Sequence, residues 1–349
     1  YSSIIKVTEE YKMDVFKELF EDLKGDVGVR SIAETMSTSD LPNLLLGTAL
    51  DRALLKAYRE YPADYEGYVY LDKVKDFRTA DRIYEYGGDG ALDEVKELEP
   101  YQYSALADGI YQIKVAKFGR KIGFSWEAYL NDDLGALRRL TEKLARAARR
   151  TELRLVTSLF ETPSGPSSTL FASTAPKSNL GTAKLSITSL GSALEAIAAH
   201  TTPDGEPIYT ERLHLVVPVS LEATARNLLN AIEVQYTEGS TIWKTENWMK
   251  TRIVLHVNPY ISIIDATNGK SSWFLFPDPA DIETLVLAKL TGHEEPEIFM
   301  KNPNAMRIGG GEDPFGGDFD TDSIEYKVRH VIGGAVFDWR GCYASTGTA

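Results

Sequence analysis

Three aspartates at alternate positions are the best candidates for metal chemistry in the sequence. Asp318, Asp320 and Asp322 have the spacing of the first ligands of a calcium loop, in which successive oxygens converge on one hard cation. Such a loop requires glycine at its sixth position and a bidentate glutamate at its twelfth, and those positions hold Ser323 and Arg329. The motif therefore fails as a specific calcium site, and an acidic turn is the simpler interpretation.

The histidines and the single cysteine have no pattern typical of a catalytic or zinc site. Acidic residues follow His293, but no second histidine follows at the spacing that would place two imidazoles on one helix face. His214 and His256 lie in apolar stretches, where a buried histidine with hydrogen-bond partners is commoner than a catalytic base. Cys342 stands among aromatic residues in a predicted strand, so a buried thiol is expected. No catalytic residue, cofactor site or metal site is predicted.

Composition and charge exclude several classes of protein. The 349-residue chain has 38 lysines and arginines against 51 aspartates and glutamates, a net charge of −13 that opposes phosphate binding over most of the surface. One cysteine excludes an internal disulfide and a thiolate zinc site. No apolar run is long enough to form a transmembrane helix, so no membrane association is expected.

Hydrophobic periodicity indicates the elements that must position these residues. Helical spacing predicts helices at residues 8–24, 41–61, 132–160, 186–200 and 221–232. The third of these helices would span on the order of 40 Å. Apolar stretches predict strands at 213–219, 253–257, 261–264, 273–276 and 324–336, and the last of these is expected to continue to Tyr343. This mixture predicts an α+β fold of packed layers.

Tyrosine is concentrated in one part of the chain, since ten of the 18 tyrosines fall between positions 58 and 111. Alternating residues there predict two paired strands, at 67–77 and 110–125, with a polar middle. Two strands bury too little apolar surface to be stable alone, so this arm must lie on something else. Tyrosine is enriched at interfaces, which favours a neighbouring subunit, and a tyrosine-rich edge of an ordinary sheet is the alternative.

Basic residues are concentrated on the long predicted helix. Between positions 132 and 161 there are seven basic residues against five acidic ones, whereas residues 60–99 and 289–325 are strongly acidic. A solvated helix face explains such a run, and blocks of opposite charge in one chain also suit self-association. The seven basic residues are Arg138, Arg139, Lys143, Arg146, Arg149, Arg150 and Arg154.

The order of these elements resembles that of the major capsid proteins of tailed bacteriophages, which have the HK-ninety-seven-like capsid fold. Four stretches are similar to segments of that family: VKDFR at 74–78, KIGFSWEAY at 121–129, WFLFPDP at 273–279 and EYKVRHVIGGAVFDWRGCYASTG at 325–347. The resemblance implies an amino-terminal arm at 1–64 and an extended β-hairpin loop at 65–125. It also implies a peripheral domain at 126–185 and 308–349, with a spine helix and a closing strand, and an axial domain at 186–307.

The function that the resemblance implies is structural and not enzymatic. The chain would assemble with itself into hexamers and pentamers of an icosahedral head that encloses double-stranded DNA. A scaffolding segment or protein, a maturation protease and a portal are the implied partners, and a decoration protein is left open. The subunit would assemble in the host cytoplasm and reside in the virion, without cofactors and without covalent cross-links between subunits.

Contacts between subunits are expected from the tyrosine-rich loop and from the basic helix. The predicted contact residues are Tyr65, Tyr68, Tyr84, Tyr86, Arg138, Arg139, Arg146, Arg149 and Arg150. Two alternatives remain open. One is an encapsulin-type shell around a cargo protein, and the other is a metal-dependent hydrolase that uses the three aspartates of residues 318–322 and Glu325.

Overall fold

The structure is a computed structural model that describes residues 41–86, 107–125, 134–202, 205, 207–231, 233–238, 241–301 and 318–348, with only the backbone described in parts of these ranges. The predicted helix at 8–24 lies outside them. The described residues form two compact units. One draws on Tyr1–Glu60, Gly119–Arg146 and Pro296–Arg329, and the other on Tyr61–Phe118, Ala147–Glu295 and His330–Ala349. The four predicted segments follow other boundaries and remain a prediction.

The four longer described helices confirm the periodicity of the sequence. They are α3 (Leu41–Glu60), α5 (Leu134–Phe160), α6 (Ile187–Ala198) and α7 (Glu222–Asn230). Helix α6 begins where the sequence predicts, because the Ser186 side chain accepts a hydrogen bond from the Ser189 N–H while the Ser189 side chain accepts one from the Ser186 N–H. Shorter turns are η1 (Asp64–Gly67), η2 (Val219–Leu221), α8 (Met249–Arg252) and α9 (Ile261–Ile264).

The strand predicted at 261–264 is wrong, since these residues form helix α9. The Asn258 side chain accepts a hydrogen bond from the Tyr260 N–H, and the Ile264 N–H then bonds to the Tyr260 carbonyl. A capping asparagine starts a turn irrespective of the apolar character of the residues that follow. Local hydrogen bonding therefore outweighs the β-propensity of the isoleucines.

One sheet is built around the long strand β15. Its members are β1 (Tyr70–Val74), β13 (Leu285–Leu290), β15 (Ser323–Val336), β14 (Glu297–Met300) and β4 (Ala116–Ser125). Strand β1 runs parallel to β13, and β13 and β14 each run antiparallel to β15, with which β4 also pairs. Strand β15 confirms the predicted strand over 324–336, but its predicted continuation to Tyr343 is wrong, because residues 337–342 leave the strand and contain a turn before β16.

The second sheet has two strands, at Leu213–Val217 and Trp273–Pro277, that are buried on both faces. Its order is β11 (Ile253–Val257), β8 (Leu213–Val217), β12 (Trp273–Pro277), β16 (Tyr343–Ser345) and β7 (Leu180–Gly181). Alternate residues of β12 face different cores: Trp273 packs with residues of α6 and α7, whereas Phe274 packs with Phe160 of α5. Continuous apolar runs in this part of the sequence therefore mark strands covered on both sides.

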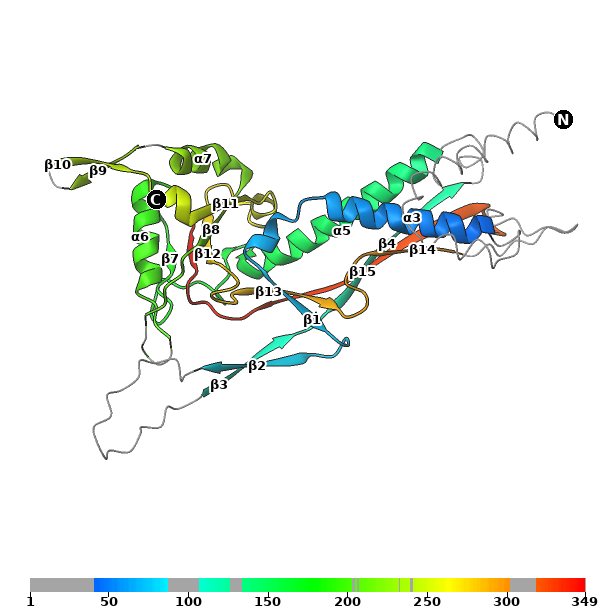
Figure 1. The fold of residues 1–349 in the computed structure, drawn as a ribbon, viewed down its shortest axis with the longest axis horizontal. Helices are drawn as coiled ribbons and strands as arrows, with labels where there is room; N and C mark the ends of the chain where they lie inside the picture. Colours follow the sequence, from blue (N-terminus) through cyan, green and yellow to red (C-terminus); the bar gives the residue numbers. More distant parts are fainter. Residues whose placement is uncertain are drawn as a thin grey trace, which may run out of the picture. The chain divides into compact units, whose positions relative to one another are not determined.

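The hairpin of the tyrosine-rich region is formed by strands other than those predicted. Strand β2 (Ala80–Tyr86) pairs antiparallel with β3 (Ala107–Ile113), as Figure 1 shows, and the predicted pairing of 67–77 with 110–125 is wrong. Residues 70–74 instead form β1 beside β13, and residues 116–125 form β4 beside β15. Two further strand pairs complete the fold: β5 (Glu161–Thr162) with β6 (Gly165–Pro166), and β9 (Glu233–Glu238) with β10 (Thr241–Glu246).

Candidate functional site

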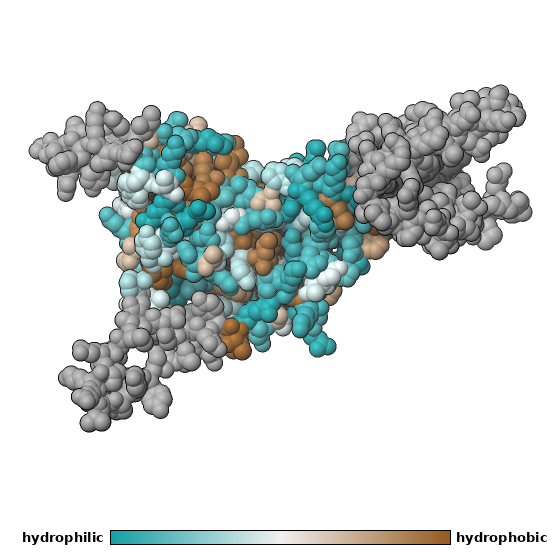
Figure 2. All heavy atoms as spheres, viewed as in Figure 1, coloured by the Kyte–Doolittle hydropathy of each residue, from teal (hydrophilic) through white to brown (hydrophobic). Residues whose placement is uncertain are grey.

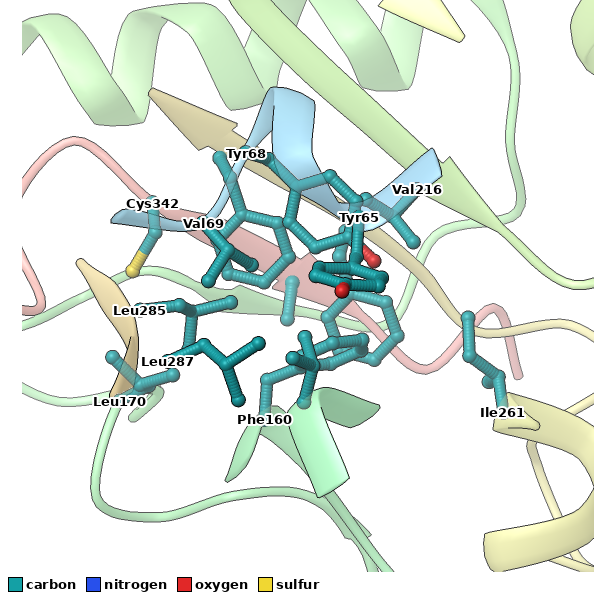
Figure 3. Close-up of a cluster of buried hydrophobic side chains, with 14 of the residues drawn as sticks. Tyr65, Tyr68, Val69, Phe160, Leu170, Val216, Ile261, Leu285, Leu287 and Cys342 are labelled. Atoms are coloured by element: carbon teal, nitrogen blue, oxygen red, sulfur yellow. The ribbon is translucent and has the colours of Figure 1, made fainter. Parts of the chain in front are cut away.

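The base of the tyrosine-rich segment is the short turn η1, which follows helix α3 after Pro62. Tyr65 and Tyr68 each expose 2% of their surface, and Figure 3 shows both rings among buried apolar side chains that include Phe160. The Tyr68 ring also stacks on Phe276, with ring centroids 5.6 Å apart. The prediction that Tyr65 and Tyr68 contact a neighbouring subunit is therefore corrected, because both side chains are in the interior of their own chain.

Tyr65 is held in the interior by a buried carboxylate on helix α5. Its hydroxyl donates a 2.7 Å hydrogen bond to Glu152 Oε2, which also accepts one of 3.2 Å from Arg149. Glu152 Oε1 lies 2.8 Å from His330 Nε2 and 3.5 Å from Lys289 Nζ. We call these five residues the Glu152 cluster. A buried charge is tolerated only when it is paired and hydrogen-bonded, and the Glu152 cluster provides both.

The Glu152 cluster changes the interpretation of Arg149. This arginine exposes 8% of its surface, and it bonds to the Tyr65 hydroxyl at 3.0 Å and to Glu66 at 3.2 Å as well as to Glu152. The predicted intersubunit role of Arg149 is therefore corrected to a structural role within one chain. Burial and the charge of Glu152 raise the pKa of Tyr65 far above its usual value, so its hydroxyl stays protonated and donates.

A second anchor of η1 is a chain of hydrogen bonds that runs from exposed Asp64 through two buried histidines. Asp64 Oδ1 lies 2.9 Å from His256 Nδ1, and Asp64 Oδ2 accepts from the Val257 N–H at 3.2 Å. His256 Nε2 lies 2.8 Å from His214 Nδ1. A carboxylate only accepts, so His256 Nδ1 donates to Asp64, and of the two facing ring nitrogens of His256 and His214 one donates and the other accepts. The prediction that His214 and His256 are buried histidines with partners is confirmed.

Burial and the neighbouring His256 shift the pKa values of His214 and Asp64 along this chain of bonds. Burial, followed by the charge of His256, lowers the pKa of His214 to about 4. Burial alone would raise the pKa of Asp64, but the hydrogen bond and charge of His256 outweigh it and bring that pKa below the usual value. Neutral His214 and ionised Asp64 are therefore the forms that the folded chain favours near neutral pH.

Acidification is expected to weaken the fold through His214. Since the folded chain binds this proton less tightly than the unfolded chain, the contribution to stability is complete above pH 6.5 and is lost as the pH falls toward 4. Acidification lowers the free energy of unfolding, which urea unfolding measures. Replacing His214 with asparagine, which keeps an N–H for His256, should make that decrease smaller by about 2 kcal/mol. The same replacement at exposed His293 is the control. If acidification lowered the free energy of unfolding equally in both variants, His214 would not be the source of the acid sensitivity.

Strands β2 and β3 present an exposed apolar pair on one face. Ile83 and Ile110 lie directly opposite each other and expose 69% and 66% of their surfaces, with exposed Asp81 and Gln112 beside them. We call Ile83 and Ile110 the isoleucine pair. In the view of Figure 2 the described surface is mostly hydrophilic with scattered apolar patches. Paired, exposed isoleucines on a two-stranded ribbon are typical of a surface that binds another protein.

The opposite face of the same ribbon is packed. Ile113 is 1% exposed, and the Tyr111 ring stacks on Phe337 with centroids 4.7 Å apart. Arg82 makes two 2.8 Å hydrogen bonds to Asp72. The sequence did not single out the isoleucine pair, because alternation shows that two faces differ and not which face is covered.

The remaining predicted contact residues lie on β2 and α5. Arg146 and Arg150 are exposed, which leaves their predicted role open. The side chains of four others lie outside the described part of the structure, and their contacts remain predictions: Tyr84, Tyr86, Arg138 and Arg139.

The acidic motif and the cysteine have structural partners. Asp318 accepts a 3.0 Å hydrogen bond from Lys301, which also lies 3.6 Å from Glu325. Within the described ranges no three His, Cys, Asp or Glu side chains are placed to hold a metal ion. Cys342 is fully buried beside Asn179, and burial raises the pKa of its thiol well above the usual range, which confirms the predicted buried thiol.

None of the described helices contains a stretch that is apolar and long enough to span a bilayer. No curated protein matches the chain in sequence. The chain is similar to the capsid asymmetric unit of cyanophage Pam1 at 12% identity and a TM-score of 0.48, over 82% of this chain and 92% of that one. It is similar to a chain of Mycobacterium phage Patience at 11% identity and a TM-score of 0.47, over 89% and 88% of the two chains.

A chain of the empty GTA particle capsid is similar at 11% identity and a TM-score of 0.47, over 81% of this chain and 89% of that one. The family model described as phage capsid protein matches residues 110–345, which include helix α5, the second sheet and strand β15. This match covers more than half of the chain and confirms the recognition made from the order of the elements. The chain is therefore a member of the phage capsid protein family, with the α+β fold that its sequence predicts.

Proposed function

We propose that this chain is the shell subunit of a tailed-phage head, which assembles with itself into hexamers and pentamers around double-stranded DNA. The observation that carries the proposal is the family match over residues 110–345. The subunit acts by enclosure and not by catalysis. In this proposal a scaffolding segment or protein, a maturation protease and a portal take part in assembly in the host cytoplasm, and the product is the virion shell.

The isoleucine pair is the proposed contact with a neighbouring copy. Covering one exposed isoleucine side chain contributes about 2 kcal/mol to the free energy of association between two subunits, and every copy of a shell repeats the contact. Exposed Arg146 and Arg150 on α5 are proposed to meet acidic segments of a neighbouring copy, because the chain has blocks of opposite charge. The net charge of −13 suits a shell whose DNA must be packed and released without adhering to the wall.

Electron microscopy combined with light scattering tests this function directly. Closed shells, or rings of five and six copies, support a capsid subunit. Nucleic acid inside the shells supports a phage head, whereas a protein cargo would favour the encapsulin-type alternative. A uniform monomer or dimer, even with scaffold and protease co-expressed, would contradict the proposal.

Replacing Ile83 and Ile110 together with glutamate should reduce the yield of shells or rings at least tenfold. Both side chains are exposed, so urea unfolding of the separate subunit should change by less than about 1 kcal/mol. The Gln112→Glu variant adds a charge on the same face but keeps the apolar surface, and it should assemble far better than the double variant. If the double variant assembles normally, the isoleucine pair has no part in assembly.

A further inference from the structure

Four exposed basic side chains form a stripe along helix α5. They follow one another at intervals of three or four residues, which places them on one side of the helix within an arc of about 80°. We call these four residues the basic stripe: Lys143, Arg146, Arg150 and Arg154. In a chain with a net charge of −13, such a stripe is a local surface for a negatively charged partner.

The described residues neutralise little of the charge of the basic stripe. Arg146 lies 3.8 Å from Glu142, and both of these side chains are about half-exposed. The other three members make no ion pair with any described residue. Glu152, the next acid along the helix, is buried and pairs with Arg149 instead. The stripe therefore leaves an excess of positive charge on the surface of the single subunit.

The amino-terminal sequence contains an acidic stripe of the same pattern. Residues 8–24, for which helical spacing predicts a helix, lie outside the described residues. In such a helix four acids would share an arc of about 80°, on the side away from the apolar residues and with Lys17 at its margin. We call these four residues the acidic stripe: Glu10, Asp14, Glu18 and Glu21.

The two stripes match in length and in spacing. The first and last members of each stripe are 11 positions apart, which is about 16 Å along a helix. From its amino end the basic stripe has intervals of three, four and four residues, and the acidic stripe has the same intervals from its carboxyl end. Two antiparallel helices would therefore place every base opposite an acid. The pairs would be Lys143 with Glu21, Arg146 with Glu18, Arg150 with Asp14 and Arg154 with Glu10.

We propose that the basic stripe is the docking site for residues 8–24 of a neighbouring copy, which lie antiparallel to α5. This inference rests on the proposed assembly of the chain with itself, and it names the acidic segment that meets Arg146 and Arg150. An amphipathic helix must cover its apolar face by packing. Its acidic face is then directed outward, which is the part of the segment that another subunit can reach.

The connection to the rest of the chain is long enough for this contact. Residues 25–40 join the acidic segment to helix α3, and 16 residues can extend over about 50 Å. Helix α5 itself is about 40 Å long. Single surface ion pairs contribute little, but a matched row of four selects one partner and one register.

Reversing the charges of one stripe at a time tests the docking in the full chain. The basic-stripe variant carries Arg150→Glu and Arg154→Glu, and the acidic-stripe variant carries Glu10→Lys and Asp14→Lys. Each variant should lower the yield of shells or rings at least tenfold, because two attractive pairs become repulsive in every copy. All four substitutions in one chain should restore at least half of the wild-type yield, since the pairs are again of opposite charge.

The control variant reverses two exposed lysines outside the stripe. Lys56→Glu with Lys270→Glu changes the net charge as much as the basic-stripe variant does, and it should assemble like the wild type. Urea unfolding of each separate subunit shows whether lost assembly reflects lost folding. An equal loss of assembly in the control and in the basic-stripe variant would overturn the proposal.

Mixing the two single-stripe variants distinguishes docking between copies from docking within one copy. Each variant should assemble poorly alone, whereas the mixture should recover, because opposite charges then meet only between different copies. A mixture that does not recover would overturn the contact between copies. Glu18→Lys with Glu21→Lys reverses as many charges at the other end of the segment and should rescue the basic-stripe variant less well than Glu10→Lys with Asp14→Lys. Equal rescue by both would overturn the antiparallel pairing.

The same experiments separate failure of the docking from failure of the proposed function. A wild type that stays monomeric contradicts the proposed function and every contact between copies. Shells that form equally well from the wild type and from both single-stripe variants would overturn the docking alone. A loss confined to the basic-stripe variant would assign the stripe to another acidic partner, such as enclosed DNA, and would also overturn the proposal.

Discussion

Replacing Glu152 with alanine is expected to lower the free energy of unfolding by about 3 to 5 kcal/mol, because it removes one partner of a buried ion pair and leaves the others. Arg149 would keep its contact with Glu66 but would lose the buried carboxylate, and Lys289 would lose it as well. The Tyr65 hydroxyl would lose the acceptor that lies 2.7 Å away. The measurement is urea unfolding followed by intrinsic tryptophan fluorescence.

Two variants show whether the loss comes from the buried charge. Glu152→Gln keeps an oxygen that can accept from Tyr65 but has no negative charge. Its free energy of unfolding should therefore lie between those of the wild type and Glu152→Ala. Glu142→Ala removes a glutamate from the same helix, whose side chain is 47% exposed and pairs with Arg146 at 3.8 Å. Surface pairs contribute little, so this variant should lose less than about 1 kcal/mol. Equal stability of Glu152→Ala and Glu142→Ala would show that the Glu152 cluster does not support the fold.

Replacing Gly333 with alanine is expected to cost about 3 kcal/mol, which is the upper part of the range for overpacking. Gly333 lies in β15, where an added Cβ would overlap the backbone carbonyl of Lys114 and approach Val115 Cα to 2.8 Å. Neither atom belongs to a flexible side chain, so the two backbones would have to separate. Urea unfolding measures the loss, and near-ultraviolet circular dichroism shows whether the packing changes.

The adjacent glycine provides the matched control. A Cβ on Gly334 would meet the end of the Leu159 side chain at 3.0 Å, and that side chain can rotate away. We therefore expect Gly334→Ala to cost less than about 1 kcal/mol. If the two variants were equally stable, the chain between β3 and β4 would not lie as close to β15 as the structure places it.

The sequence predicts single elements well and their partners poorly. Helix α5, helix α6 and strand β15 are predicted because each keeps one period along its length, and the Ser186 cap that starts α6 is seen only in the structure. The strand at 70–74 shows the limit. Its alternation is visible in the sequence, but its parallel partner β13 lies more than 200 residues further along the chain, and no local pattern encodes that choice.

The candidate site shows the same limit at the level of side chains. The number of tyrosines between positions 58 and 111 is unusual, but composition does not distinguish a tyrosine in an interface from one that bonds to a buried acid. Tyr65 is buried because Glu152 and His330, from distant parts of the chain, meet there. The sequence held no signal for this, because Glu142 also lies within the basic run on α5 and is half-exposed.

The two described strands that come latest in this sequence, β15 and β16, have inner positions in the two larger sheets. Strand β15 lies between β13 and β14, and strand β16 lies between β12 and β7. While the chain is being synthesised, β13 and β12 therefore have open edges until residues 323–345 leave the ribosome. Open edges of apolar strands pair readily with other chains. Nascent subunits thus stay vulnerable to aggregation until residues 323–345 are available to pair, and a chain that stops before residue 323 can complete neither sheet.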